Sequence, residues 1–266
     1  MEEVRVGDVY DLIDSIAPFG IQESWDNSGL CVGARDRAVK KITVALDCTA
    51  DVAREAAEKG SELIVTHHPV IFRAIKKLDL DSVVGTLAGA GLSVICAHTN
   101  FDSAVMNRLL CEKLGLTPEG PLAVENGTEM GCVCSCGSIG SRELAERIKN
   151  ALGNRVVRFN GLNERAKGRE NDIRKIAVCS GSGGSFLGEV IAGGCGAFIT
   201  GDVKHDVFID AYNEGVVVFD AGHFYTEDIF CEYMCEKLAQ SFPGVRVEKA
   251  SCDRDVVEYL VQGPGL

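Results

Sequence analysis

The chain has 266 residues, 46% of them hydrophobic, so it can bury a full core as one large domain or as two smaller ones. Its net charge of −12 disfavours nucleic acid and anionic membranes as partners, because phosphate binding depends on Lys and Arg. The basic stretch 165–169 is a local exception, which we interpret as a solvated loop.

No apolar run approaches the length of a membrane span, and the acidic N-terminal segment does not have a signal-peptide pattern. We therefore expect a cytoplasmic protein. Its twelve cysteines should be reduced and should mostly serve as small core residues.

The first part of the chain alternates helical and strand patterns. Val6, Val9, Ile13 and Ile16 share one helical face, and Pro18 ends that pattern. The short β-rich runs that follow are continuously apolar, which is typical of strands buried on both faces. The expected elements are helices at 4–17 and 51–59 and strands at 41–45, 63–65 and 92–95.

Polar residues follow two of these strands. Because adjacent residues of an extended chain point to opposite sides, His67 and His68 suit two metal ions better than one. His98 is either a ligand or a group that orients Asp102. Asp102 is either a ligand or the N-cap of a helix that starts near Ser103.

Prolines and glycines between residues 118 and 130 break any regular pattern and place the division of the chain there. The expected halves are residues 1–124 and 125–266, with a C-terminal strand that could return to the first half. Cys132, Cys134 and Cys136 alternate along a predicted strand. No fourth ligand lies nearby, so we expect core packing and not a metal site.

The second half carries its own polar segments. The loop Ser180–Ser185 follows a strand at 175–179; it could contact phosphate, but a tight turn before a helix is the favoured interpretation. His205 is either a general base or substrate contact, or a plain surface histidine. His223 and Glu227 are four residues apart, which places both side chains on one face of a helix. A further amphipathic helix is expected at 230–238.

Three blocks of the first half recur in the same order in the second. We therefore expect an α/β fold of two similar α/β domains with mostly parallel sheets. The matched blocks are 41–45 with 175–179, 60–67 with 196–202, and 91–98 with 215–223.

The polar clusters together predict a site for two divalent metal ions, with positions left open for water as in catalytic sites. Histidine and carboxylate ligands suit Fe, Mn, Zn or Co, and the sequence does not distinguish them. The predicted ligands are His67, His68, Asp102, His223 and Glu227, of which Glu227 has the reach to bridge both ions.

Five motifs make the chain resemble the Nif-three-like family, whose members carry names such as type 2 GTP cyclohydrolase I homologue and dinuclear metal centre protein. The resemblance is to the short form, without an inserted domain. It implies two similar α/β domains, a two-metal site in the cleft between them, a ring-like homohexamer, and ligand roles for the five predicted residues. The motifs are Trp25–Leu30, Thr66–Pro69, Asn100–Asp102, Thr200–Asp202 and Gly222–Glu227.

Two functions compete at this point. The first is a metal-dependent hydrolase of GTP-cyclohydrolase type, which adds water at C8 of a purine nucleotide or acts on a related phosphorylated small molecule and releases formate. His205 or His98 would then transfer protons. The second is a metal-binding regulatory protein, such as a transcription-factor partner or a metal store. Five ligands for two ions leave coordination open, which favours the enzyme.

Overall fold

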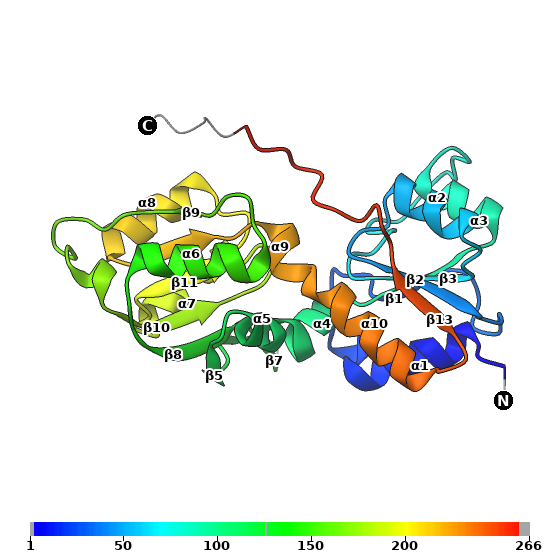
Figure 1. The fold of residues 1–266 in the computed structure, drawn as a ribbon, viewed down its shortest axis with the longest axis horizontal. Coiled ribbons are helices and arrows are strands. Elements are labelled where there is room, and N and C mark those ends of the chain that lie inside the picture. The colour runs from blue at the N-terminus through cyan, green and yellow to red at the C-terminus, as the bar shows by residue number, and fades with distance from the viewer. Residues whose placement is uncertain (1–2, 126, 261–266) are drawn as a thin grey trace. The chain divides into compact units, whose positions relative to one another are not determined.

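The computed structural model describes residues 3–125 and 127–260, which form two compact units (Figure 1). The first unit consists of Met1–Met106 and Asp228–Asp253, and the second of Asn107–Glu227 and Arg254–Leu266. The division differs from the expected one at 124/125. The Pro- and Gly-rich segment there is not a linker, since it forms the strands β5 (Thr117–Gly120), β6 (Ala123–Glu125) and β7 (Thr128–Met130) inside the second unit.

The first unit is a five-stranded sheet with helices on both faces. The strand order is β1-β4-β3-β2-β13, and all neighbours are parallel except β1 and β4. Figure 1 shows α2 and α3 on one side of this sheet and α1 and α10 on the other. The strands are β1 (Gly29–Val32), β2 (Lys41–Ala45), β3 (Leu63–Thr66), β4 (Ser93–Cys96) and β13 (Arg246–Lys249), and the helices are α1 (Val6–Ile16), α2 (Ala50–Glu58), α3 (Val83–Ala90) and α10 (Ile229–Ser241).

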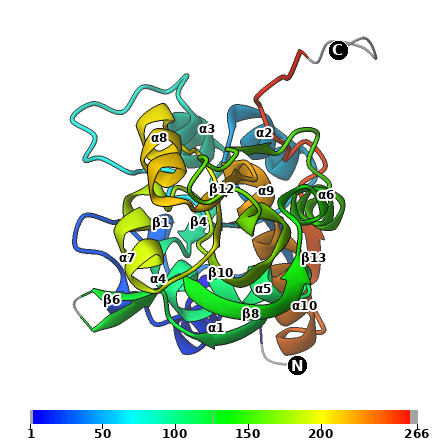
Figure 2. The ribbon, with the colours of Figure 1, turned by 90° about the vertical axis from the view of Figure 1, so that its left-hand side faces the viewer.

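The second unit is a six-stranded sheet in the order β5-β8-β10-β11-β12-β9. Only β10-β11 and β11-β12 are parallel pairs, so "mostly parallel" describes the first sheet and is wrong for the second. Figure 2 shows α7 and α8 on one side of the sheet and α6 and α5 on the other. The strands are β8 (Cys132–Ile139), β9 (Arg158–Phe159), β10 (Ile173–Val178), β11 (Ala197–Thr200) and β12 (Val217–Asp220), and the helices are α5 (Asn107–Lys113), α6 (Ser141–Leu152), α7 (Leu187–Ala192), α8 (His205–Glu214) and α9 (His223–Glu227).

The predicted internal repeat is confirmed by the strand order. In each unit three consecutive parallel strands lie side by side, β2-β3-β4 in the first and β10-β11-β12 in the second. These strands are apolar and almost wholly buried, as both-face coverage by helices requires. The histidine and carboxylate clusters follow the carboxyl ends of the second and third strand of each set, where α/β sheets bind their ligands.

Two of the three cysteines of β8 are part of the core, as predicted, and Cys136 is half-buried. Cys132 and Cys134 are buried, and the thiol of Cys134 donates to Cys111 Sγ at 3.4 Å. Among residues 3–125 and 127–260, no group of three candidate metal ligands includes a thiol of β8. A membrane span is also missing from the described part, because no helix there is both long and apolar enough.

Candidate metal centre

His67 and His68 stand at the end of β3, where the backbone stays extended. The His68 N–H donates to Leu46 O at 3.0 Å, which continues the ladder between β2 and β3 past the last strand residue. His67 Nδ1 is 2.7 Å from Ala97 O, and His68 Nδ1 is 2.8 Å from a carboxylate oxygen of Asp47. Each ring therefore donates a hydrogen bond from Nδ1, and its Nε2 points away from that acceptor.

His98 joins this pair from the end of β4. One ligand atom from each of His67, His68 and His98 lies within 4.8 Å of the others. The Nδ1 of His98 is 2.8 Å from Asp26 Oδ1, so the carboxylate that orients this ring is Asp26. His98 therefore belongs to the histidine cluster. The alternative expectation was that His98 orients Asp102, but the carboxylate at its Nδ1 is Asp26.

Asp26 is a fully buried carboxylate that ties its own segment to the residues that follow β4. It accepts hydrogen bonds from Ser28 Oγ at 2.9 Å and from Thr99 Oγ1 at 2.6 Å, as well as from the His98 ring. Burial alone would raise the pKa of Asp26, but the hydrogen bonds from His98 and Thr99 and the charge of His98 outweigh it and leave the pKa below its ordinary value of 3.8. Asp26 is thus ionised and fixes the ring of His98.

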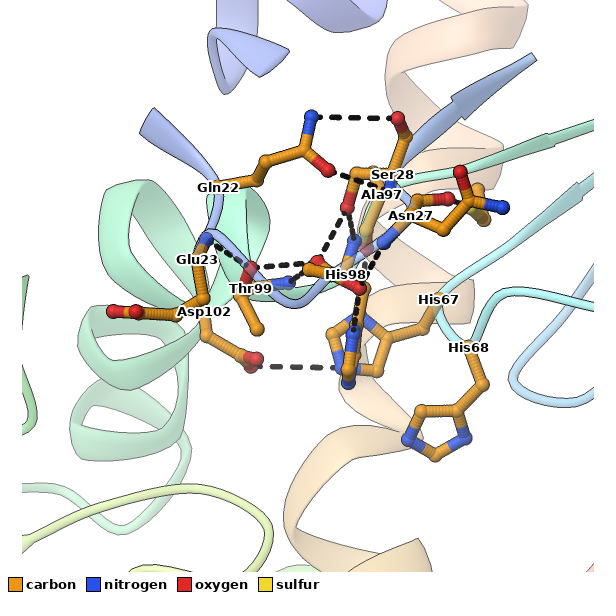
Figure 3. Close-up of polar contacts among 12 residues, drawn as sticks. Gln22, Glu23, Asn27, Ser28, His67, His68, Ala97, His98, Thr99 and Asp102 are labelled. Atoms are coloured by element: carbon orange, nitrogen blue, oxygen red, sulfur yellow. Dashed lines mark hydrogen bonds and ion pairs between the residues drawn. The ribbon is translucent and has the colours of Figure 1, made fainter. Parts of the chain in front are cut away.

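Asp102 lies inside a helical segment and is not an N-cap. The segment begins with α4 (Thr99–Phe101), and Asp102 has helical φ and ψ of −53° and −49°. It opens a single π-turn, Asp102–Met106, a feature that is frequent at functional sites. An Oδ1 to His67 Nε2 distance of 3.5 Å brings Asp102 beside the histidine cluster (Figure 3).

The second unit holds the other two predicted ligands on the short helix α9. His223 Nε2 is 3.0 Å from Glu227 Oε2, as expected for residues four apart on a helix. His223 Nδ1 is 2.9 Å from Asp202 Oδ2. Among the described residues, Asp202 is the one non-glycine residue with a positive φ, 51°, a conformation that Asp tolerates better than most residues.

The loop Ser180–Ser185 packs against this pair and is a tight turn. The amides of Ser180, Gly181 and Gly183 already donate to Asn107 Oδ1, Thr226 Oγ1 and Thr200 Oγ1. Because these three amides are occupied, the structure favours the turn over the phosphate contact. Gly181 has φ +60°, and a Cβ there would overlap Glu227 Oε1, so only glycine permits this approach.

His205 is the first residue of α8 and is exposed. No hydrogen bond, ion pair or ring contact places it at either ligand group, so its suggested role in proton transfer stays a prediction.

Four histidines of the described chain share one arrangement. In His67, His68, His98 and His223, Nδ1 faces an oxygen that can only accept a hydrogen bond. Each neutral ring then carries its proton on Nδ1 and its lone pair on Nε2. This is the pattern of metal-binding histidines, whose second nitrogen is held by a carbonyl or carboxylate. The donor set of imidazole and carboxylate fits a divalent transition metal.

The residues that orient these rings were not predicted from the sequence. Asp47 follows β2 just as His67 follows β3, and that position was a usable signal. Asp26 and Asp202 occurred in the quoted motifs but received no role. Thr226 supports α9 by donating to His223 O at 2.8 Å while it accepts from the Gly181 amide.

Comparison with known proteins supports the family resemblance. The family model described as Duf34/NIF3 (NGG1p interacting factor 3) matches residues 4–255. A Clostridium perfringens protein named GTP cyclohydrolase 1 type 2 homolog is 35% identical over 237 residues, 84% of this chain and 87% of the relative. A Helicobacter pylori protein named GTP cyclohydrolase 1 type 2 is 34% identical over 88% of this chain and 91% of its own. The crystal structure of Staphylococcus aureus hypothetical protein SA1388 is similar with a TM-score of 0.88 at 26% identity, over 97% of this chain and 100% of the other.

Proposed function

Because this chain belongs to the Duf34/NIF3 family, we propose that it is a metal-dependent hydrolase that opens the ring of a purine nucleotide such as GTP. Curated relatives at 34–35% identity carry the name GTP cyclohydrolase 1 type 2 or its homolog. The proposed cofactors are two divalent metal ions per chain, and the proposed ligands are His67, His68, Asp102, His223 and Glu227.

The shared arrangement of the four histidines is the observation that carries this proposal. A histidine kept for packing or for solubility has no need of an oxygen acceptor on Nδ1 together with a second nitrogen turned toward other ligands. Here the Nε2 of His67 faces the carboxylate of Asp102, and the Nε2 of His223 faces that of Glu227. Each unit thus offers imidazole nitrogen and carboxylate oxygen together, which is the ligand set of hydrolytic metal sites.

We propose that the ligands of both units serve the same pair of ions. The course of the chain supports this. Asp102 lies four residues before the chain passes from the first unit to the second at Met106, and Glu227 is the last residue before it returns. Both carboxylates therefore lie close in sequence to a point where the chain passes from one unit to the other.

The chemistry follows from these residues. Divalent ions, when bound, would supply water activation near neutral pH and stabilisation of a developing negative charge. The rings of the three proposed histidine ligands are oriented by Ala97 O, Asp47 and Asp202. His98 lies in the first cluster with its Nδ1 proton held by Asp26, so its Nε2 is the atom that could accept or return a proton. We propose His205 as a second proton carrier.

Formate release tests the hydrolase. Purified full-length protein is stripped with a chelator, reloaded with Mn, Fe, Zn or Co, and incubated with GTP. We expect release that requires metal, rises from acid toward neutral pH, and is lost in His68→Ala. Equal background release from wild type and His68→Ala with every metal would sink the cyclohydrolase assignment.

The family description favours one alternative function. It names an interacting factor of the protein NGG1p, which fits a metal-binding interaction protein without catalysis. Metal content and formate release separate the two candidates. An interaction protein would hold its metals in the wild type, lose them in the ligand variants, and release no formate in either form.

A further inference from the structure

An exposed aromatic pair lies beside the histidine cluster of the first unit. Trp25 is 57% exposed and Phe72 is 48% exposed, although large aromatic side chains usually contribute to the core. The two ring centroids are 5.8 Å apart. Both rings are directed at the edge of His98, with centroid distances of 6.0 and 6.4 Å. The pair therefore continues the surface of the candidate site.

The pair is held in place by hydrogen bonds beneath it. Asn27 Nδ2 donates to Ile71 O at 2.6 Å, which joins the loop of Trp25 to the loop of Phe72. The neighbour of Trp25, Asp26, is fixed by His98 and Thr99. Because these hydrogen bonds hold the two loops, the exposed rings form a preorganised surface. A ligand would therefore lose little binding free energy in ordering the two side chains.

The loop that carries Phe72 is basic in an acidic protein. From Val70 to Leu78 the sequence contains three cations and no acidic residue, and all three cations are exposed; Asp79 and Asp81 follow before α3 begins, so the loop keeps a small net positive charge. The chain as a whole has a net charge of −12. The positive charge of this segment, in a chain of negative net charge, is suited to binding an anion. Lys and Arg are the side chains with which proteins bind phosphate. The three cations are Arg73, Lys76 and Lys77.

We propose that Trp25 and Phe72 form a stacking platform for the base of a purine mononucleotide, whose phosphates are bound by Arg73, Lys76 and Lys77. The inference rests on the proposed function and names the subsite through which the substrate is held. A base inserted between the rings would need about 7 Å between them, so at 5.8 Å the base stacks on an outer face of the pair. The overall negative charge favours a mononucleotide over a nucleic acid strand.

Trp25 is the one tryptophan of the chain, so its fluorescence reports on this platform alone. Full-length protein, both chelator-treated and zinc-loaded, is titrated with GTP, guanosine and inorganic triphosphate. Excitation at the red edge of the indole band avoids absorption by the purine. We expect saturable quenching by GTP, weaker but saturable quenching by guanosine, and none by triphosphate.

Variants test the stacking ring and the phosphate-binding cations separately, while Trp25 is kept as the fluorescent reporter. Phe72→Leu should weaken GTP binding about five- to hundredfold, the range expected for one lost stacking contact. Phe159→Leu removes another exposed phenylalanine, in the second unit, and should leave the affinity unchanged. Replacing Arg73, Lys76 and Lys77 together by Gln should weaken GTP binding and leave guanosine binding unchanged.

The outcomes distinguish this inference from the proposed function. Formate release from GTP without any change in Trp25 emission would overturn the platform and leave the hydrolase standing. Quenching without formate release would support the platform and remove the hydrolase. Two further results would overturn the mononucleotide: quenching by an RNA oligonucleotide at lower concentration than by GTP, or emission that depends on protein concentration because a second copy covers the pair.

Discussion

Replacing Asp26 by Asn tests how the first unit holds its histidine cluster. The carboxylate accepts hydrogen bonds from the amide of Asn27 and the His98 ring on Oδ1, and from Ser28 Oγ and the amide and hydroxyl of Thr99 on Oδ2. Asparagine turns one of these oxygens into an NH2 group. Whichever way the amide is oriented, its NH2 then faces a backbone N–H, that of Asn27 or that of Thr99, which cannot become an acceptor.

One lost hydrogen bond to a charged, buried group costs about 1.5–3 kcal/mol. For a chain of this size that corresponds to a fall in Tm of roughly 3–12 °C. The matched control is Asp36→Asn, the same chemical change at an exposed residue, which should leave the free energy of unfolding within about 0.5 kcal/mol of wild type. Thermal unfolding of chelator-treated protein, followed by circular dichroism, measures both. Because Asp26 orients His98, the proposed proton carrier, formate release by the metal-loaded protein should also fall.

The pH dependence of this effect has a definite sign. Burial raises the pKa of Asp26, but hydrogen bonds from His98 and Thr99 bring it below the ordinary value of 3.8. A carboxyl group whose pKa is lowered by folding stabilises the protein fully above its unfolded pKa and loses that contribution as the pH falls. The Tm difference between wild type and Asp26→Asn should therefore narrow below about pH 4. A difference no larger than that of Asp36→Asn, or one that widens on acidification, would refute the reasoning.

Three further predictions concern the second unit. Gly181→Ala should lower metal content, because its Cβ would overlap Glu227 Oε1, whereas Gly188→Ala in α7 meets nothing within 4 Å and should retain the metal. Elemental analysis of both variants decides this. Replacing the three thiols of the segment Cys132–Cys136 by Ala should leave metal content unchanged, and loss of one ion per chain would contradict a purely structural role. His205→Ala should lower the rate of formate release without removing metal. An unchanged rate would contradict a role of His205 in proton transfer.

Much of the fold could be predicted from the sequence, because it depends on local patterns. The runs that became β2, β3 and β4, and their matches β10, β11 and β12, are short and mostly buried, so pattern and repeat together specified the three central strands of each sheet. The domain boundary was wrong for a physical reason. Prolines and glycines mark turns of any kind, and here they shape a hairpin inside the second unit. The expected return of a C-terminal strand to the first half is confirmed by β13, which pairs with β2. That α10 returns with it depends on tertiary packing.

The candidate ligands could be predicted, whereas the residues that orient them could not. His67, His68, His223 and Glu227 are of ligand type and occur at interpretable spacings. Asp26 meets His98 across 72 residues of sequence, and no local pattern encodes that contact. Asp102 was open between ligand and N-cap, because a carboxylate near a helix start suits both roles. Only the helical backbone at Asp102 excludes the cap.

The metal content of two variants tests the central proposal most directly. Wild type should hold two divalent ions per chain. His68→Ala should hold about one, because a histidine serves a single ion, and Glu227→Ala should hold none, because a bridging carboxylate serves both. His205→Ala is the matched histidine control and should hold two, and circular dichroism should show that all three variants are folded. If folded Glu227→Ala still bound two ions per chain, the shared two-metal centre proposed here would be wrong.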